Sequence, residues 1–159
     1  MVDFAVKMNI SELDRFDQAI LQEMAGDGRI SVTELAQRIG LSKSPTQARL
    51  KRLEKERYIT GYSAQLDPIR LGLNHVAFVE VRLSNTREAS LSDFNRAVRK
   101  IPEVEQCHML AANFDYLLKV RVKDMMAYRE VLGEKISSLP HVASTSTYVA
   151  MQAVKDGSL

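Results

Sequence analysis

The 159-residue sequence contains a single cysteine, Cys107, and no apolar run long enough to cross a bilayer. One cysteine excludes an intramolecular disulfide framework and is typical of a reducing compartment. A transmembrane helix needs about 18 or more consecutive apolar residues. The N-terminal stretch MVDFAVKMNI also lacks the apolar core and small-residue cleavage site of a secretory signal. We therefore predict a cytoplasmic protein without a membrane partner.

The sequence also has few of the residue clusters on which enzymes and metalloproteins depend. Its three histidines, His75, His108 and His141, are widely separated, and Cys107 neighbours only His108. Neighbouring strand residues point to opposite faces, so a Cys-His dipeptide in a strand cannot give both side chains to one metal ion without distortion. No nucleophile elbow, HExxH motif or P-loop is present, and Gly26-Asp27-Gly28 follows a helix and is best explained as a plain turn. We predict no enzyme activity, no metal site and no cofactor.

Charge is modest overall but unevenly distributed. The net charge is +2, with a sequence pI of about 8.7. Residues 11–36 carry two basic and six acidic side chains, whereas residues 42–57 carry six basic and two acidic ones. The positive field is thus concentrated on one segment, as in proteins that bind nucleic acid, although most charge runs are simply solvated helix faces.

That basic segment belongs to a pattern of two helices joined by a glycine turn. Ser31 to Glu34 fits a reciprocal capping box, and Gly40 stands where a left-handed residue ends the first helix. Ser42 can cap the second helix, with Pro45 in its first turn. The spacing predicts helices over about 12–26, 31–39 and 42–56, followed by a short hairpin or wing at 58–66. This is the winged helix-turn-helix arrangement, which places its second helix in the major groove of DNA.

Helical periodicity divides the side chains of that second helix. Leu50 and Leu53 are expected to point inward, with Thr46 near the same face. Ser44, Gln47, Ala48 and Lys51 share the opposite face, where they can contact base edges, while Lys43, Arg49 and Arg52 can bind phosphates. The predicted DNA contacts are Lys43, Ser44, Thr46, Gln47, Ala48, Arg49, Lys51 and Arg52.

The second half of the chain alternates between strand and helix periodicity. Strands are expected over 75–83, 104–110, 116–122 and 142–151, with helices ending at Pro102 and Pro140. The order β-α-β-β-α-β predicts a ferredoxin-like sheet with helices on one face only. We expect a partner on the other face, where Val76 and Phe78 mix with charged residues. The chain is therefore predicted to be α+β, with a DNA-binding domain at 1–62, a linker at 63–74 and a second domain at 75–159.

Two polar segments of the second domain are candidates for a small-ligand site. Asn113-Phe114-Asp115 joins two predicted strands, and Asp115 could pair with an ammonium group. The hydroxyls of Thr145-Ser146-Thr147 could bind a carboxylate. An ordinary hairpin loop and a β-favouring surface remain the alternative explanations, and no local pattern shows that the segments meet.

Several motifs in fixed order resemble the Lrp/AsnC (leucine-responsive, feast/famine) transcriptional regulators. They are LDRFDQAIL at 13–21, DGRISVTELAQRIGLS at 27–42, RLKRLEKERYITGYSAQLDP at 49–68, FDYLLKVRVKDMMAYREVLGEKISSLPHV at 114–142 and STYVAM at 146–151. The likeness covers nearly the whole chain from Leu13 onward. The version AANFDYLLKVR at 111–121 looks most like the branch that activates proline dehydrogenase genes in response to proline.

This resemblance implies a regulator of amino-acid metabolism that binds double-stranded DNA, forms dimers and often octamers, and responds to a small amino acid such as proline or leucine. It places the ligand loop at 111–115, with Asp115 binding the amino group and Thr145 and Thr147 lining the same pocket. Ala112 and Asn113 stand where the family usually has glycine and an acidic residue. The implied ligand-binding residues are Ala112, Asn113, Asp115, Thr145 and Thr147. The alternative function is an architectural protein that wraps DNA without any effector.

Overall fold

The computed structural model describes residues 13–155 and divides them into two compact units, one ending at Gln65 and the other beginning at Leu66. The boundaries given above stay a prediction. Within residues 13–155, no helix combines the length and apolar character needed to cross a bilayer. The α+β fold predicted from the sequence is confirmed.

The N-terminal unit consists of three helices, α1 (Arg15–Gly26), α2 (Val32–Ile39) and α3 (Lys43–Lys55). Ile20, Leu35 and Leu53, one from each helix, are fully buried and form the centre of its core. Gly40 ends α2 with a φ of 72°, the left-handed conformation that glycine adopts most readily. The helix-turn-helix predicted from the sequence is confirmed.

The capping at the helix starts differs from the predicted pattern. Ser31 Oγ accepts a bond from the Glu34 amide at 3.2 Å, but the Glu34 carboxylate pairs with Arg38, so only half of the predicted box forms. The reciprocal box lies instead at α1, where the side chains of Asp14 and Asp17 each accept a bond from the other's amide. An acidic residue can fill either position of such a box, so the Ser/Thr-to-Glu pattern alone did not identify it.

A short hairpin or wing was predicted at 58–66, and the hairpin is wrong, because this segment forms neither strand nor helix. Arg57, with a φ of 66°, ends α3, and the Tyr58 amide donates to the Leu53 carbonyl at 2.9 Å. Ile59 then packs on the core, and the Tyr62 hydroxyl donates to Glu54 at 2.7 Å. The residues from 60 to 67 are exposed, so a hairpin here would have no apolar face to bury, and an isolated two-stranded hairpin is at best marginally stable.

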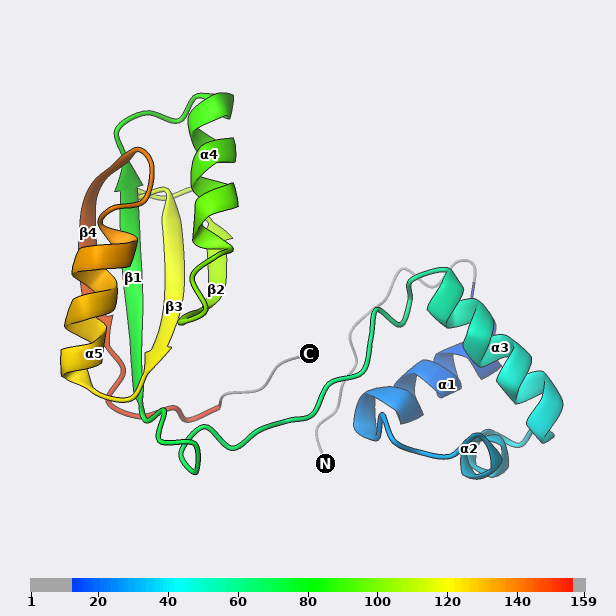
Figure 1. The fold of residues 1–159 in the computed structure, drawn as a ribbon. Coiled ribbons are helices and arrows are strands. Elements are labelled where there is room, and N and C mark those ends of the chain that lie inside the picture. The colour runs from blue at the N-terminus through cyan, green and yellow to red at the C-terminus, as the bar shows by residue number, and fades with distance from the viewer. Residues whose placement is uncertain (1–12, 156–159) are drawn as a thin grey trace. The chain divides into compact units, whose positions relative to one another are not determined.

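The C-terminal unit is an antiparallel four-stranded sheet in the order β2-β3-β1-β4. Its strands are β1 (His75–Leu83), β2 (Val104–Met109), β3 (Tyr116–Val122) and β4 (Val142–Val149). The helices are α4 (Glu88–Val98) and α5 (Met125–Glu130), the latter continuing into the π-helical segment η1 (Val131–Ile136). Figure 1 shows α4 and α5 on the same face of the sheet, which confirms the ferredoxin-like prediction.

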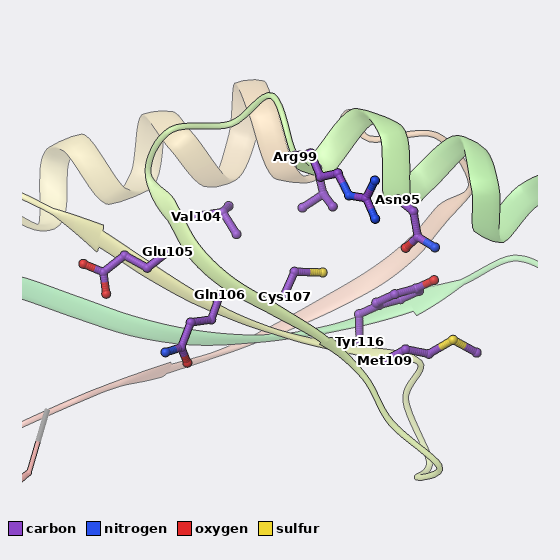
Figure 2. A pocket seen from close by; sticks show the side chains of 9 residues that line it. Asn95, Arg99, Val104, Glu105, Gln106, Cys107, Met109 and Tyr116 are labelled. Carbon is purple, nitrogen blue, oxygen red and sulfur yellow. The ribbon is translucent and has the colours of Figure 1, made fainter. Parts of the chain in front are cut away.

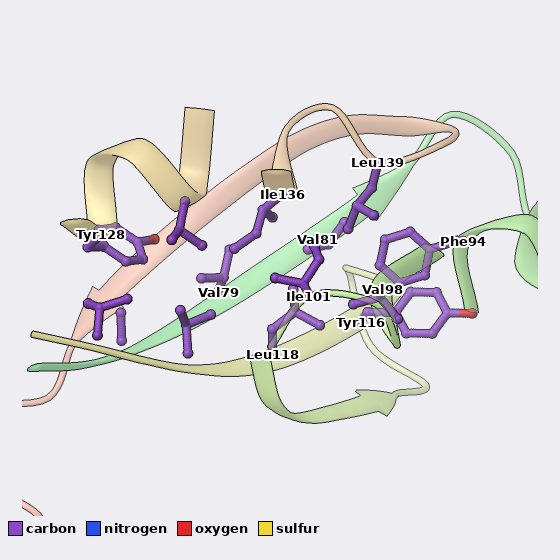
Figure 3. Close-up of a cluster of buried hydrophobic side chains, with 14 of the residues drawn as sticks. Val79, Val81, Phe94, Val98, Ile101, Tyr116, Leu118, Tyr128, Ile136 and Leu139 are labelled. Carbon is purple, nitrogen blue, oxygen red and sulfur yellow. The ribbon is translucent and has the colours of Figure 1, made fainter. Parts of the chain in front are cut away.

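Alternate residues of the strands build the core between the sheet and these helices. Figure 3 shows Val79 and Val81 of β1 packed with Leu118 of β3 beneath Phe94 and Ile136 from the helical layer. All five side chains are fully buried. The opposite face of the sheet carries the other residues of each strand, including Val76, Phe78, Leu117 and Tyr148.

Candidate functional sites: helix α3 and the loop after β2

The face of α3 directed away from the core is polar and open. Lys43, Ser44, Gln47, Ala48 and Lys51 are all exposed. They share one side of the helix because the core residues Leu50 and Leu53 occupy the other. The side therefore offers an amide, a hydroxyl, a methyl group and two ammonium groups, which are the groups that bind base edges and phosphates in a major groove.

Thr46 does not belong to this open face. Its side chain is fully buried, and its hydroxyl donates to the Ser42 carbonyl at 2.9 Å. Ser42 in turn makes no side-chain capping bond. The prediction that Thr46 contacts DNA is therefore corrected, since its side chain completes the first turn of α3 from within the unit.

The two arginines predicted to bind phosphates already have acidic partners on α1. Arg49 Nη1 lies 2.9 Å from Asp17 Oδ1 and 2.7 Å from Asp14 Oδ2. Arg52 Nη2 lies 2.5 Å from Asp17 Oδ2. The hydrogen bond to Asp17, with that to Asp14, raises the pKa of Arg49, and the Asp17 amide holds the pKa of Asp14 below its usual value.

Asp17 is the residue that the sequence analysis missed at this site. It is 1% exposed, although it is a carboxylate near a helix start. A signal was present in the sequence, because Asp17 is four residues after Leu13 and three before Ile20, both of which are buried. Helical spacing therefore places its carboxylate on the apolar side of α1, where a charge needs partners.

The predicted ligand loop is anchored to the end of β1. The Asp115 amide donates to the Val81 carbonyl at 3.0 Å, and its carboxylate accepts a bond from the Leu83 amide at 2.7 Å. The carbonyl of Asn113 accepts a bond from Arg82. Ala112 is exposed. The loop thus presents Ala112 and Asn113 to solvent, while Asp115 is partly buried.

The two threonines lie on the other side of β1. Thr145 pairs with Val81 and Thr147 with Val79, so both side chains point to the helix-covered face. The Thr147 hydroxyl is 2.5 Å from the Tyr128 hydroxyl of α5, a partner that the sequence analysis did not anticipate. Because Tyr116 pairs with Val81 from the opposite side, two strand spacings, about 10 Å, separate the backbones near Asp115 and Thr145. Within one chain the ligand loop and the two threonines therefore lie on opposite sides of β1.

The C-terminal unit contains a cavity of about 470 Å³ between α4 and β2, and none of the five predicted ligand residues lines it. In Figure 2, Asn95 and Arg99 extend from α4 toward Cys107 and Tyr116. Burial raises the pKa of the Cys107 thiol to about 11, with the Arg99 guanidinium acting weakly in the opposite direction. A second cavity, of about 290 Å³, lies beside α5 and is also free of the predicted residues. Among residues 13–155, no three His, Cys, Asp or Glu side chains come together as metal ligands.

Comparison with known proteins matches both units. Residues 13–60 match a winged helix-turn-helix DNA-binding family, and residues 76–159 match the Lrp/AsnC ligand binding domain. The chain belongs to the Lrp/AsnC family. It is therefore a transcriptional regulator with a DNA-binding unit and a ligand-binding unit, and not an enzyme.

Relatives of the regulator are similar over most of their length. It is 61% identical to a proline dehydrogenase transcriptional activator of Rhizobium radiobacter, over 91% of this chain and 93% of the relative. It is 47% identical to the leucine-responsive regulatory protein of Escherichia coli K12, over 91% of this chain and 88% of the relative. The sequence likeness to the proline dehydrogenase activator branch is thus confirmed.

Solved structures of the family share its fold. A Neisseria meningitidis transcriptional regulator in complex with L-Met has a TM-score of 0.84 at 33% identity, covering 91% of this chain and 93% of that one. An AsnC family regulator from Agrobacterium tumefaciens has a TM-score of 0.85 at 30% identity, and the match covers 91% of this chain and 94% of that one.

Proposed function

We propose that this regulator binds specific double-stranded DNA sites through the open face of α3 and controls genes of amino-acid metabolism in the cytoplasm. The supporting observation is the cluster of exposed Lys43, Ser44, Gln47, Ala48 and Lys51 on one side of a helix whose other side is anchored in the core. Gln47 and Ser44 would contact base edges, and Lys43 and Lys51 would contact phosphates. The names of the relatives support genes of proline or leucine metabolism as the targets.

The test begins with duplexes selected by the protein from a random DNA pool. Binding of the full-length protein to a selected duplex and to its shuffled version is measured by fluorescence anisotropy over a range of salt concentrations. Lys51→Ala should weaken binding to both and lower the salt slope by about 0.9 per subunit, because one phosphate contact is lost. Lys100→Ala is the matched control, since Lys100 is also exposed but lies in the other unit.

Two outcomes would overturn the proposal. If no duplex is enriched and selected and shuffled DNA bind equally, the protein is an architectural DNA-wrapping protein. If Lys51→Ala and Lys100→Ala behave alike, α3 is not the DNA-contacting helix.

We further propose that an amino acid, proline first, is the effector and binds near Asp115. The carboxylate of Asp115 would bind the amino group, Ala112 and Asn113 would lie over the ligand, and Thr145 and Thr147 would contribute hydroxyls. Since Asp115 and Thr145 lie on opposite sides of β1 within one chain, a neighbouring copy would complete the site. The partly buried Asp115 in an exposed loop supports this arrangement.

A thermal-shift screen of the twenty amino acids tests the effector. A ligand that binds only the folded protein raises its melting temperature. Asp115→Asn keeps an acceptor for the Leu83 amide and removes the charge, so it should abolish the shift while leaving the melting temperature without ligand nearly unchanged. A response to another amino acid but not to proline would refute the proline assignment, and a response in Asp115→Asn equal to the wild type would refute the site.

Assembly through the open face of the sheet completes the proposal. Phe78 pairs with Tyr148 across β1 and β4 on the side without helices, and Tyr148 is 54% exposed. A second copy of the chain would cover this face to form a dimer, and dimers would associate further into octamers. Two copies would present two α3 helices to half-sites about one or more helical turns apart.

A further inference from the structure

The acidic start of α1 neutralises two of the positive charges on α3. Asp17 accepts bonds from Arg49 on one oxygen and from Arg52 on the other, at 2.9 and 2.5 Å. Asp14, which is exposed, adds a second carboxylate 2.7 Å from Arg49. Two carboxylates thus face two guanidinium groups, and the cluster as a whole carries no net charge.

Arg49 is held by more contacts than Arg52, whose side chain is 44% exposed and is paired with Asp17. The Asp17 side chain is 2% exposed, so its carboxylate is held within the unit. Its Oδ2 atom also accepts the Asp14 amide of the capping box at 3.4 Å, which ties the carboxylate to the first turn of α1. The Arg49 guanidinium carbon lies 5.6 Å from the centre of the Phe16 ring, a cation–π contact that adds to the ion pair. Lys43 and Lys51, in contrast, have no ion pair among the described residues.

Charges on a DNA-binding helix act on all sequences alike, because phosphates are the same at every site. Each additional phosphate contact strengthens specific and non-specific binding together. Keeping surplus cations on the recognition helix away from the backbone therefore weakens binding to the many competing non-specific sites.

We propose that Asp17 is a positioning residue, which holds Arg49 and Arg52 away from the phosphates so that non-specific DNA binding stays weak. This inference rests on the proposed DNA binding by α3. It reverses the role predicted for the two arginines from the sequence. The simpler alternative is that the ion pairs only join α1 to α3. The two explanations predict different salt dependences of DNA binding.

The first test changes the arginines singly in the full-length protein, so that Asp17 keeps one partner in each variant. Arg49→Gln and Arg52→Gln should leave the salt slope for shuffled duplex as in the wild type, whereas Lys51→Gln should lower it by about 0.9 per subunit. A decrease of the same size in either arginine variant would show that the arginine contacts a phosphate, and would overturn the inference.

The second test removes the carboxylate that the two arginines share, which leaves Arg52 without its ion pair and Arg49 with Asp14 alone. Asp17→Asn should strengthen binding to shuffled duplex and raise its salt slope by up to about 1.8 per subunit. The triple variant Asp17→Asn, Arg49→Gln, Arg52→Gln should restore the wild-type slope, which a purely structural role would not predict. A folded Asp17→Asn protein, judged by circular dichroism, with an unchanged slope would overturn the inference. If Asp17→Asn does not fold, the single arginine variants decide whether the inference holds. If the wild type and Lys51→Gln show the same salt slope, the proposed function itself has failed.

Discussion

The position of Cys107 lowers the reactivity of its thiol. It lies partly buried beside the α4–β2 cavity, and burial raises the pKa of its thiol to about 11. Only the thiolate reacts rapidly with disulfides and alkylating reagents. The reaction of the native protein with a disulfide reagent at pH 8 should therefore be roughly a hundredfold slower than that of the urea-unfolded chain. Equal rates would show that the thiol is not shielded.

Glu103 gives an acid-sensitive contact to the C-terminal unit. Its hydrogen bond with Lys135, at 2.5 Å, lowers the pKa of the carboxyl group despite partial burial. A carboxyl group with a lower pKa in the folded state stabilises the protein above its unfolded pKa of about 4.5, and this contribution is lost as the pH falls through the folded value. Urea unfolding at pH 7 and pH 3 should show that Glu103→Gln loses less stability on acidification than the wild type. Glu130→Gln, at an exposed position, should lose as much as the wild type.

For single residues, the sequence predicted which side of a helix is buried better than it predicted which side chains pair with one another. The open face of α3 follows from helical periodicity, because Leu50 and Leu53 define the buried side. Periodicity also put Thr46 near the buried side, and the structure shows that its side chain cannot reach DNA. The pairing of Arg49 and Arg52 with Asp17 spans more than 30 residues of sequence, and a helical pattern contains no information about which helices lie side by side.

At the scale of elements, the turn between α2 and α3 has a specific backbone requirement. Gly40 has a φ of 72°, and no atom lies within 4 Å of where its Cβ would stand. Gly40→Ala is therefore strained by conformation and not by collision, and it should destabilise the N-terminal unit by about 1 kcal/mol. Urea denaturation followed by helical circular dichroism measures this. Gly61→Ala is the control, because that position is open and has no positive φ, and an equal loss there would contradict the explanation.

Helices and core strands were predictable because their apolar spacing is long and regular, whereas the absence of a hairpin at 58–66 was not predictable. The residues at 58–66 have strand propensity, but a hairpin also needs a surface to cover, and the structure offers none within the unit. The change from α5 to the π-helical η1 was equally hidden. Val131 and Ile136 remain buried through that change, so the apolar spacing in the sequence predicts one continuous helix.

For the whole molecule, the open face of the sheet leads to a prediction about assembly. Phe78 is half-buried on that face and lies opposite Tyr148. A charge placed there would have to be desolvated when a second copy covers the sheet, so Phe78→Glu should shift the protein toward the monomer in analytical ultracentrifugation. Met126→Glu changes a side chain that is 77% exposed at the start of α5, and it should sediment as the wild type does.

The same variant connects assembly with DNA binding. Two α3 helices in one dimer bind a paired site far more tightly than one, since the second helix binds at a high effective concentration once the first is in place. If the open sheet face joins the two copies, folded Phe78→Glu should bind a selected duplex at least tenfold more weakly, with a salt slope about half that of the wild type, because half as many phosphates are contacted. Binding to a single half-site should change little, as α3 itself is intact. Anisotropy titrations with both duplexes measure this, and equal losses on the two would place the defect in the helix-turn-helix unit instead of the assembly.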